Sequence, residues 1–210
     1  MPVLAYCLAP PVEITAIPPG ADGARVEAFE LPGLRCYFSE HQEFATSAEE
    51  LQAAALAYHA VVQEVFAVTT LIPFRFPTLL ASAAELRRKI EERASEYESA
   101  LVRLAGTAQM EINIQAVAER GPAASGTEYL RARQQATHRA RQLATEARQA
   151  VGDLARNWRE REFQDRLQCF ALLARGTEND FLARLSALRV SPRVECRIVG
   201  PWPPAEFVDM

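Results

Sequence analysis

Residues 109–117 read Gln-Met-Glu-Ile-Asn-Ile-Gln-Ala-Val, and their polar and apolar side chains alternate. Alternation with a period of two is typical of a β-strand that buries one face. The stretch follows a charged helical pattern and a glycine, Gly106. We therefore place a domain boundary there and expect an N-terminal α+β domain over residues 1–105 and a C-terminal α+β domain over residues 106–210.

Upstream of this boundary the pattern predicts mostly β-β-β-α-β-α. Both helices are opened by a serine with a glutamate three residues later, which is the spacing of a capping box. These pairs are Ser47 with Glu50 and Ser82 with Glu85. The expected strands cover residues 3–8, 25–29, 34–38 and 68–76, the last one closed by Pro77, and the second helix runs to about Leu104.

Downstream, apolar residues at steps of three and four predict one long helix over residues 127–163, after a flexible break at residues 121–126. A strand (167–173), a helix (178–188) and a last strand (193–199) follow. Helices segregated beside a mixed sheet fit an α+β fold better than a doubly wound one. Arginines outnumber acids on the long helix. A solvated face explains this best, a protein-docking face comes second, and no motif supports nucleic-acid binding.

The chain ends Gly200-Pro201-Trp202-Pro203-Pro204-Ala205-Glu206-Phe207-Val208-Asp209-Met210. Three prolines and a glycine exclude a helix there and interrupt any strand ladder, yet the segment carries two large aromatic side chains. We expect this tail, residues 200–210, to run extended over the protein's own surface, with Trp202 or Phe207 seated in an apolar groove. It would then strap the second half to the first. The alternative is a free tail that captures a partner.

A second unusual string surrounds Arg75, which lies between Phe74 and Phe76. An arginine in that position is expected to be partly buried, and a buried guanidinium needs carboxylate or carbonyl partners. A fixed internal ion pair is favoured over an anion or partner contact, because helix carboxylates are plentiful nearby.

Composition excludes several classes of function. The 210 residues are 49% hydrophobic with a net charge of −4, which is ordinary for a globular protein and gives no overall attraction to nucleic acid or anionic lipid. No uninterrupted apolar run approaches 18 residues, so we expect no membrane span. The four cysteines lack Cys-x-x-Cys spacing and the three histidines are scattered, which predicts reduced buried thiols, no metal, no cofactor and no catalytic residues.

Three segments of the chain together resemble the gas vesicle protein F/L family. They are Pro73-Phe74-Arg75-Phe76, Gly126-Thr127-Glu128-Tyr129-Leu130 and, most specifically, Gly200-Pro201-Trp202-Pro203-Pro204. Two positions depart from the family pattern. Pro77 stands where the family usually has glycine, and Ala205-Glu206 stands where it usually has tyrosine and serine.

The resemblance implies a cytoplasmic, gas-vesicle-associated accessory or minor structural protein that is not an enzyme. Such proteins are thought to bind the small hydrophobic shell protein, and other accessory proteins are further expected partners. The implied fold is two α+β domains, the second a modified ferredoxin-like one. The residues expected to bind a partner or strap the domains are Phe74, Arg75, Phe76, Trp202, Pro203, Pro204 and Phe207.

Two other readings stay open at this point. One is a scaffold or regulatory protein of the same fold in a role outside gas vesicles. The other is an enzyme with an unrecognised site around Arg75, His41 and the tail.

Overall fold

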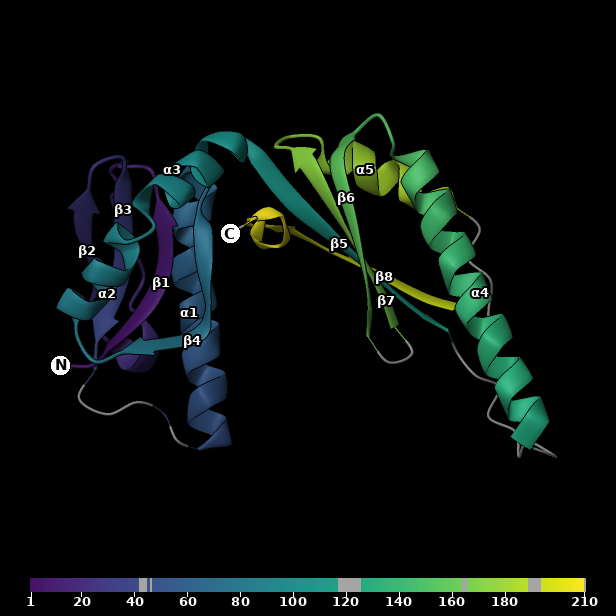
Figure 1. The fold of residues 1–210 in the computed structure, drawn as a ribbon, viewed down its shortest axis with the longest axis horizontal. Helices are drawn as coiled ribbons and strands as arrows, with labels where there is room; N and C mark the ends of the chain where they lie inside the picture. Colours follow the sequence, from purple (N-terminus) through teal and green to yellow (C-terminus); the bar gives the residue numbers. More distant parts are fainter. Residues whose placement is uncertain (42–44, 46, 117–125, 164–165, 189–193, 210) are drawn as a thin grey trace. The chain divides into compact units, whose positions relative to one another are not determined.

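The computed structural model describes residues 1–41, 45, 47–116, 126–163, 166–188 and 194–209. The chain forms two compact units (Figure 1). Unit 1 comprises Met1–Gly106 together with Trp202–Met210, and unit 2 comprises Thr107–Pro201. The sequence pattern assigned the tail to the second half, whereas its contacts group it with the first.

Unit 1 is built on a four-stranded sheet with the strand order β2-β3-β1-β4. Its strands are β1 (Val3–Ala9), β2 (Val26–Leu31), β3 (Leu34–Glu40) and β4 (Ile72–Leu80). The neighbouring pairs are antiparallel. A short 3-10 turn, η1 (Ala21–Gly23), precedes β2. Every residue of β1 is buried, as expected for a central strand that is covered on both faces.

Helices cover both faces of this sheet (Figure 1). One face packs on α1 (Ala48–Val68), and the other packs on α2 (Ala83–Glu91) and α3 (Ala94–Arg103). The capping box predicted for α1 is confirmed, because the Glu50 backbone N–H donates to the Ser47 hydroxyl at 3.2 Å and the Ser47 N–H donates to the Glu50 carboxylate at 3.0 Å. Unit 1 is therefore a three-layer sandwich.

Helix α1 is amphipathic. Its inner face buries Tyr58, Val61 and Val65 against the sheet. In length and apolar composition α1 also resembles a membrane-crossing helix, although no uninterrupted apolar run of that length was expected. Burial of one face against the sheet is the pattern of a core helix. Its outer face is considered below.

Unit 2 has the element order β-α-β-β-α-β and the strand order β6-β7-β5-β8. This is the arrangement of the ferredoxin-like split β-α-β fold. Its elements are β5 (Thr107–Ala116), α4 (Gly126–Ala150), β6 (Ala155–Phe163), β7 (Arg166–Ala174), α5 (Glu178–Ser186) and β8 (Val194–Trp202). The alternation predicted for β5 holds from Met110 onward, since Met110, Ile112 and Ile114 are buried beneath α4 and α5, whereas Gln109 is itself buried.

The long helix predicted over residues 127–163 is wrong. Helix α4 ends at Ala150, a turn around Gly152 follows, and β6 pairs antiparallel with β7 from Ala155 onward. Arginine and glutamate favour a helix locally, so the pattern pointed to a continuation. These residues form a strand instead, because pairing with β7 satisfies their backbone and packs Trp158 against the core of unit 2. The predicted break at residues 121–126 lies mostly outside the described residues.

Two boundaries in unit 1 also differ from expectation. Helix α1 continues through Val68, and β4 runs past Pro77 to Leu80. Pro77 is tolerated because β4 lies at the edge of the sheet, where a missing N–H breaks no ladder. The second predicted helix is two helices, because Arg93 leaves helical backbone geometry (φ −130°, ψ 20°).

The close approach of Gly200 on β8 to β5 gives a testable prediction. Its φ is +128°, and an added Cβ would lie 2.8 Å from the Met110 sulfur and 2.9 Å from the Gln109 carbonyl oxygen. Gly200→Ala is therefore expected to destabilise unit 2 by about 2–4 kcal/mol. The matched control is Gly176→Ala, which shares a positive φ (+91°) but meets no atom within 4 Å. Equal losses in chemical denaturation would show that steric crowding contributes nothing.

Candidate functional site

The Phe74-Arg75-Phe76-Pro77 segment forms a bulge in β4. In the ladder with β1, Pro73 pairs with Cys7 and Thr78 pairs with Ala5, so four residues of β4 stand opposite one residue of β1. A bulge of this kind bends the strand and changes the direction of its side chains. Phe74 consequently packs on the cluster beneath α2 and α3, whereas Phe76 contacts Tyr58 of α1.

Tyr58 fixes the bulge to α1. Its hydroxyl donates to the Phe74 carbonyl oxygen and also lies 3.0 Å from the Tyr6 carbonyl oxygen. Its ring stacks on Tyr6 with centroids 5.5 Å apart and meets Phe76 at 5.3 Å. Burial raises the pKa of Tyr58 well above its ordinary value, so the group is a permanent donor. These contacts hold backbone that the bulge has removed from the sheet ladder.

Arg75 corrects a prediction. The side chain is exposed, whereas both neighbouring phenylalanines are half-buried. Arg75 lies inside the bulge of an edge strand, where Phe74 and Phe76 turn towards helices on opposite faces of the sheet and the side chain between them is left facing solvent. The expected burial of the Arg75 guanidinium in an internal ion pair is therefore wrong. Arg75 is available to solvent at the sheet edge.

The tail lies against unit 1. Pro203, Pro204 and Phe207 are buried, and Phe207 is completely inaccessible to solvent (0%) in a short 3-10 turn, η2 (Ala205–Phe207). Trp202 is half-buried, with its ring edge-on to His59 of α1 at 5.3 Å. Of the two aromatics, Phe207 is thus the one seated fully inside the unit.

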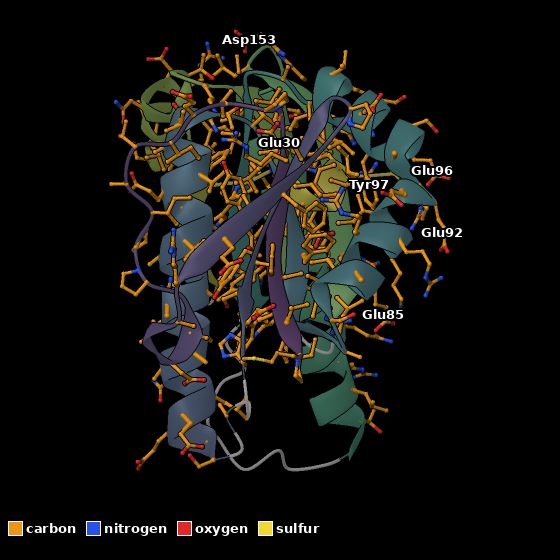
Figure 2. The ribbon with its side chains drawn as sticks, turned by 90° about the vertical axis from the view of Figure 1, so that its left-hand side faces the viewer. Glu30, Glu85, Glu92, Glu96, Tyr97 and Asp153 are labelled. Carbon is orange, nitrogen blue, oxygen red and sulfur yellow. The ribbon has the colours of Figure 1, made fainter. Side chains whose placement is uncertain are left out.

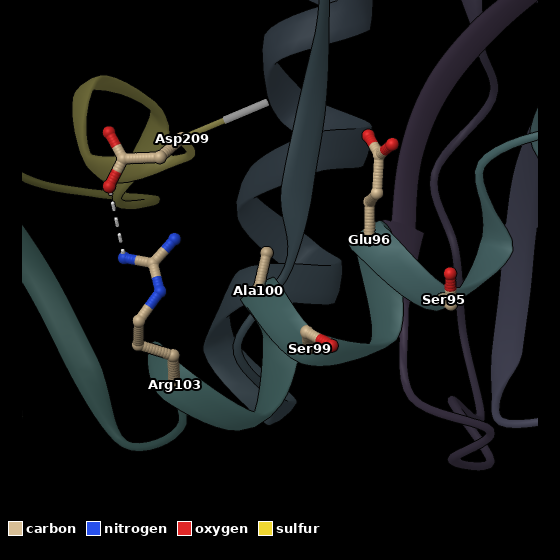
Figure 3. Close-up of a pocket in the computed structure, with 6 residues that line it drawn as sticks. All are labelled: Ser95, Glu96, Ser99, Ala100, Arg103 and Asp209. Atoms are coloured by element: carbon tan, nitrogen blue, oxygen red, sulfur yellow. Dashed lines mark ion pairs between the residues drawn. The ribbon is translucent and has the colours of Figure 1, made fainter.

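The end of the tail meets α3. The Arg103 guanidinium donates to the Phe207 carbonyl oxygen at 3.0 Å and lies 3.6 Å from the Asp209 carboxylate. Val208 packs on the same cluster as α2 and α3. A surface pocket of about 410 Å³ surrounds this contact (Figure 3). It is lined by Ser95, Glu96, Ser99, Ala100, Arg103 and Asp209.

The tail therefore contacts helices from both outer layers of unit 1. Trp202 meets α1 on one face of the sheet, and Phe207 meets α3 on the other. The bulge and the tail together place all seven predicted site residues in unit 1. The bulge contacts Tyr58 of α1, and Trp202 of the tail contacts the next residue, His59. Tyr58 is buried, whereas His59 is exposed. Sequence reasoning missed Tyr58, His59 and Arg103. Only Tyr58 carried a signal, its helical apolar spacing.

One polar network resembles a catalytic triad. The Ser39 hydroxyl lies 2.7 Å from Nε2 of His41, and Nδ1 of His41 lies 3.6 Å from the Asp22 carboxylate. A nucleophile must reach its substrate, however, and Ser39 is completely buried with its hydroxyl also 2.7 Å from the Tyr6 hydroxyl. The geometry supports a structural role, in which each buried polar group satisfies the next.

His41 makes the stability of unit 1 depend on pH. Burial lowers the pKa of His41, and the nearby Asp22 carboxylate opposes this less strongly. The unfolded chain therefore binds the proton more readily, so stability is lost as pH falls through the ordinary histidine range. His41→Gln is expected to flatten the dependence of the unfolding free energy on pH between about pH 7 and 5, by at most about 1.4 kcal/mol per pH unit. The unfolding free energy is measured by urea titration at several pH values. If its dependence on pH is the same for His41→Gln and the unmodified chain, the prediction is contradicted.

The described ranges contain no group of three or more His, Cys, Asp or Glu side chains able to hold a metal ion. The cysteines are free thiols on strands. Cys7, Cys36 and Cys169 are buried, and Cys196 is half-buried. Burial raises the pKa of Cys169 to about 12, so this thiol is protonated and unreactive at neutral pH.

The fold is similar to that of two solved gas vesicle proteins. The chain superimposes on the gas vesicle protein GvpF from Anabaena sp. PCC7120 with a TM-score of 0.81 at 15% identity, covering 100% of this chain and 96% of that one. GvpF from Microcystis aeruginosa gives a TM-score of 0.80 at 16% identity, with 100% and 99% coverage. No curated protein sequence matches. The model of the gas vesicle synthesis protein GvpL/GvpF family matches residues 2–209, so the chain belongs to that family.

Proposed function

We propose that this protein assists gas vesicle assembly by binding the small hydrophobic shell protein, without catalysing a reaction. Membership in a family of gas vesicle synthesis proteins supports a role in gas vesicle formation. The finer role, binding the shell protein, rests on the surface of unit 1. A hydrophobic subunit needs its apolar surface covered until it is incorporated, and a protein that covers it needs an exposed apolar surface of its own.

The observation that carries the proposal is the outer side of α1. Four apolar residues lie along one stripe, at spacings of three, four and seven residues, and all are exposed. They are Ala53, Leu56, Ala60 and Ala67, and we call them the α1 stripe. Leu56 is 66% exposed, which is high for a leucine on a core helix. Val68, at the end of the same helix, is 52% exposed.

The composition of the α1 stripe suits a helical or extended apolar partner. Alanines allow close approach of a second backbone, and Leu56 supplies the larger contact. Helix α1 contains no lysine or arginine, so a hydrophobic partner meets no long basic side chain there. The rigid frame beneath the stripe is α1 packed on its sheet and held at its start by the capping box.

The predicted site residues divide into two roles under this proposal. Phe207, Pro203 and Pro204 are buried, and we propose that they hold unit 1 together rather than touch a partner. Arg75 is exposed, and Trp202 is half-buried beside α1. We propose that these two lie at the margin of the binding surface. Phe74 and Phe76 position the bulge from inside.

Co-expression tests the proposal. The affinity-tagged full chain and the shell protein are produced in one host, and the tagged protein is recovered at high and low salt. An apolar contact predicts that the shell protein is recovered in both, because screening affects charges and leaves hydrophobic burial intact. Absence of the shell protein from both fractions, with the tagged chain folded, would remove the proposal and favour a scaffold role elsewhere.

A further inference from the structure

The two units carry opposite charge. Unit 1 contains 16 acidic and 8 basic residues, whereas unit 2 contains 11 acidic and 15 basic residues. The overall charge of −4 thus conceals an acidic unit and a basic unit in one chain. Opposite potentials on a single molecule favour contact between unlike regions of different copies.

The acidic excess does not lie on α2 and α3. These helices, with the two residues that join them, carry five acids and five bases, and the two signs pair with one another. Figure 2 shows this side of unit 1, with Glu85, Glu92 and Glu96 labelled. Arg88 lies 2.8 Å from Glu92, and Lys89 lies 3.6 Å from Glu85. The rest of unit 1 therefore holds eleven acids and three bases. Exposed members include Glu13, Glu27, Glu40, Glu49 and Glu64.

The basic excess has a distinct location on α4. The core of unit 2 takes Ala140, Leu143, Ala144 and Ala147 from this helix, and these residues define its inner side. The opposite side is exposed, carries amide side chains with one arginine and one histidine, and has two further arginines at its margins. It presents Arg131, Gln135, His138, Gln142 and Gln149, flanked by Arg141 and Arg148, and we call it the α4 outer face.

The α4 outer face also contains two shallow cavities. One shallow cavity of about 310 Å³ is lined by Leu130, Gln134, Thr137, His138 and Arg141. Another of about 420 Å³ is lined by Gln134, Gln135, His138, Arg139 and Gln142. Leu130 is 58% exposed, so an apolar contact is available within a basic surface. A surface that combines arginine, amides and one apolar residue suits a protein partner with carboxylates.

We propose that the α4 outer face binds the acidic part of unit 1, outside α2 and α3, on a second copy of this chain. The complementary surface is present on the same molecule, so each copy offers both halves of the contact. Such a contact is heterologous, and it links copies head to tail. Unit 1 is acidic, so a nucleic acid would meet repulsion from half of each molecule, which favours a protein partner.

Salt dependence gives the first test. Sedimentation velocity of the full chain is measured at about 10 mM and about 1 M ionic strength, where charges act over about 30 Å and 3 Å. We expect species heavier than the 23.3 kDa chain at low salt, increasing with concentration, and the monomer alone at high salt. A monomer under both conditions would overturn the proposal. So would association that is unaffected by salt, or retention of a labelled oligonucleotide without self-association.

Chemical cross-linking gives the second test, because Lys89 is the single lysine of the chain and a new lysine amine is therefore easily distinguished. Arg131→Lys and Arg148→Lys each place a new amine on the α4 outer face without changing the charge. A zero-length carbodiimide reagent then joins amines to neighbouring carboxylates in an equimolar mixture of ¹⁴N and ¹⁵N protein. We expect isotopically mixed links from the new amine to carboxylates of unit 1 outside α2 and α3. Links confined to one copy, or to other acids, would contradict the proposed contact.

A charge variant completes the design. Arg131→Glu/Arg148→Glu should weaken low-salt association by at least roughly tenfold. The matched control is Arg87→Glu/Arg88→Glu, which makes the same change in net charge on α2 and should leave association within about twofold. Equal losses in the two variants would show that net charge alone, rather than the α4 outer face, governs association.

Discussion

Replacing Phe207 by alanine is expected to destabilise unit 1 by about 3–5 kcal/mol and to lower its melting temperature by about 10–20 °C. The side chain is 0% exposed, its backbone carbonyl is held by Arg103, and the neighbouring Val208 lies on the same core. Thermal unfolding followed by circular dichroism measures the loss.

Hydrogen exchange locates the effect of this substitution. Phe207→Ala should raise exchange in α3 and β1 of unit 1 while β5 and β7 of unit 2 keep their protection. Phe181→Ala is the matched control, since Phe181 is also 0% exposed but lies in the core of unit 2, and it should give the reverse pattern. Trp202→Ala should cost less, because its ring is half-buried. Unchanged protection of α3 in Phe207→Ala would show that the tail is not part of the core of unit 1.

Placing a charge on the α1 stripe is expected to abolish recovery of the shell protein. Leu56→Glu would put a carboxylate into an apolar contact, where an unpaired charge costs several kcal/mol, so the co-purified shell protein should fall roughly ten- to a hundredfold. Leu56 is 66% exposed, so the free protein should keep its stability. Circular dichroism and the melting temperature check this separately.

Val102→Glu is the matched control for this experiment. Val102 is an apolar residue on α3 with 78% exposure, on the other face of the unit 1 sheet. The same change of charge there should leave recovery of the shell protein within about twofold of the unmodified chain. Equal losses for the two variants would indicate a response to net charge and would remove the α1 stripe from the account.

Local patterns predicted much of the fold. The alternation in β5, the capping box of α1 and the Ser82 N-cap of α2 are properties of neighbouring residues, so the chain shows them directly. The same local reasoning failed at β6, where residues with good helical propensity are held in a strand by pairing with β7. The bulge in β4 was equally hidden, because its cause is a mismatch with β1, about 70 residues away.

The candidate site shows the same division. The prolines and aromatic residues of the tail indicated a docked segment, and this prediction needed only the composition of the tail. Its receptor was not predictable, since Arg103 and the cluster beneath α3 are brought to Phe207 only by the folded chain. Burial of Arg75 was inferred from its phenylalanine neighbours, but the bulge in the edge strand β4 leaves it exposed. Exposure at a single position depends on strand geometry as well as on neighbours.

Holding the shell protein in solution is the most direct test of the proposed function. The shell protein is diluted from denaturant into buffer with or without an excess of the full chain, and the amount left in the supernatant is measured after centrifugation. The account predicts that the shell protein stays in the supernatant in a complex with the unmodified chain, and that it sediments with Leu56→Glu. If it sediments equally with the unmodified chain and with an unrelated protein of the same size, this protein does not cover the apolar surface of the shell subunit.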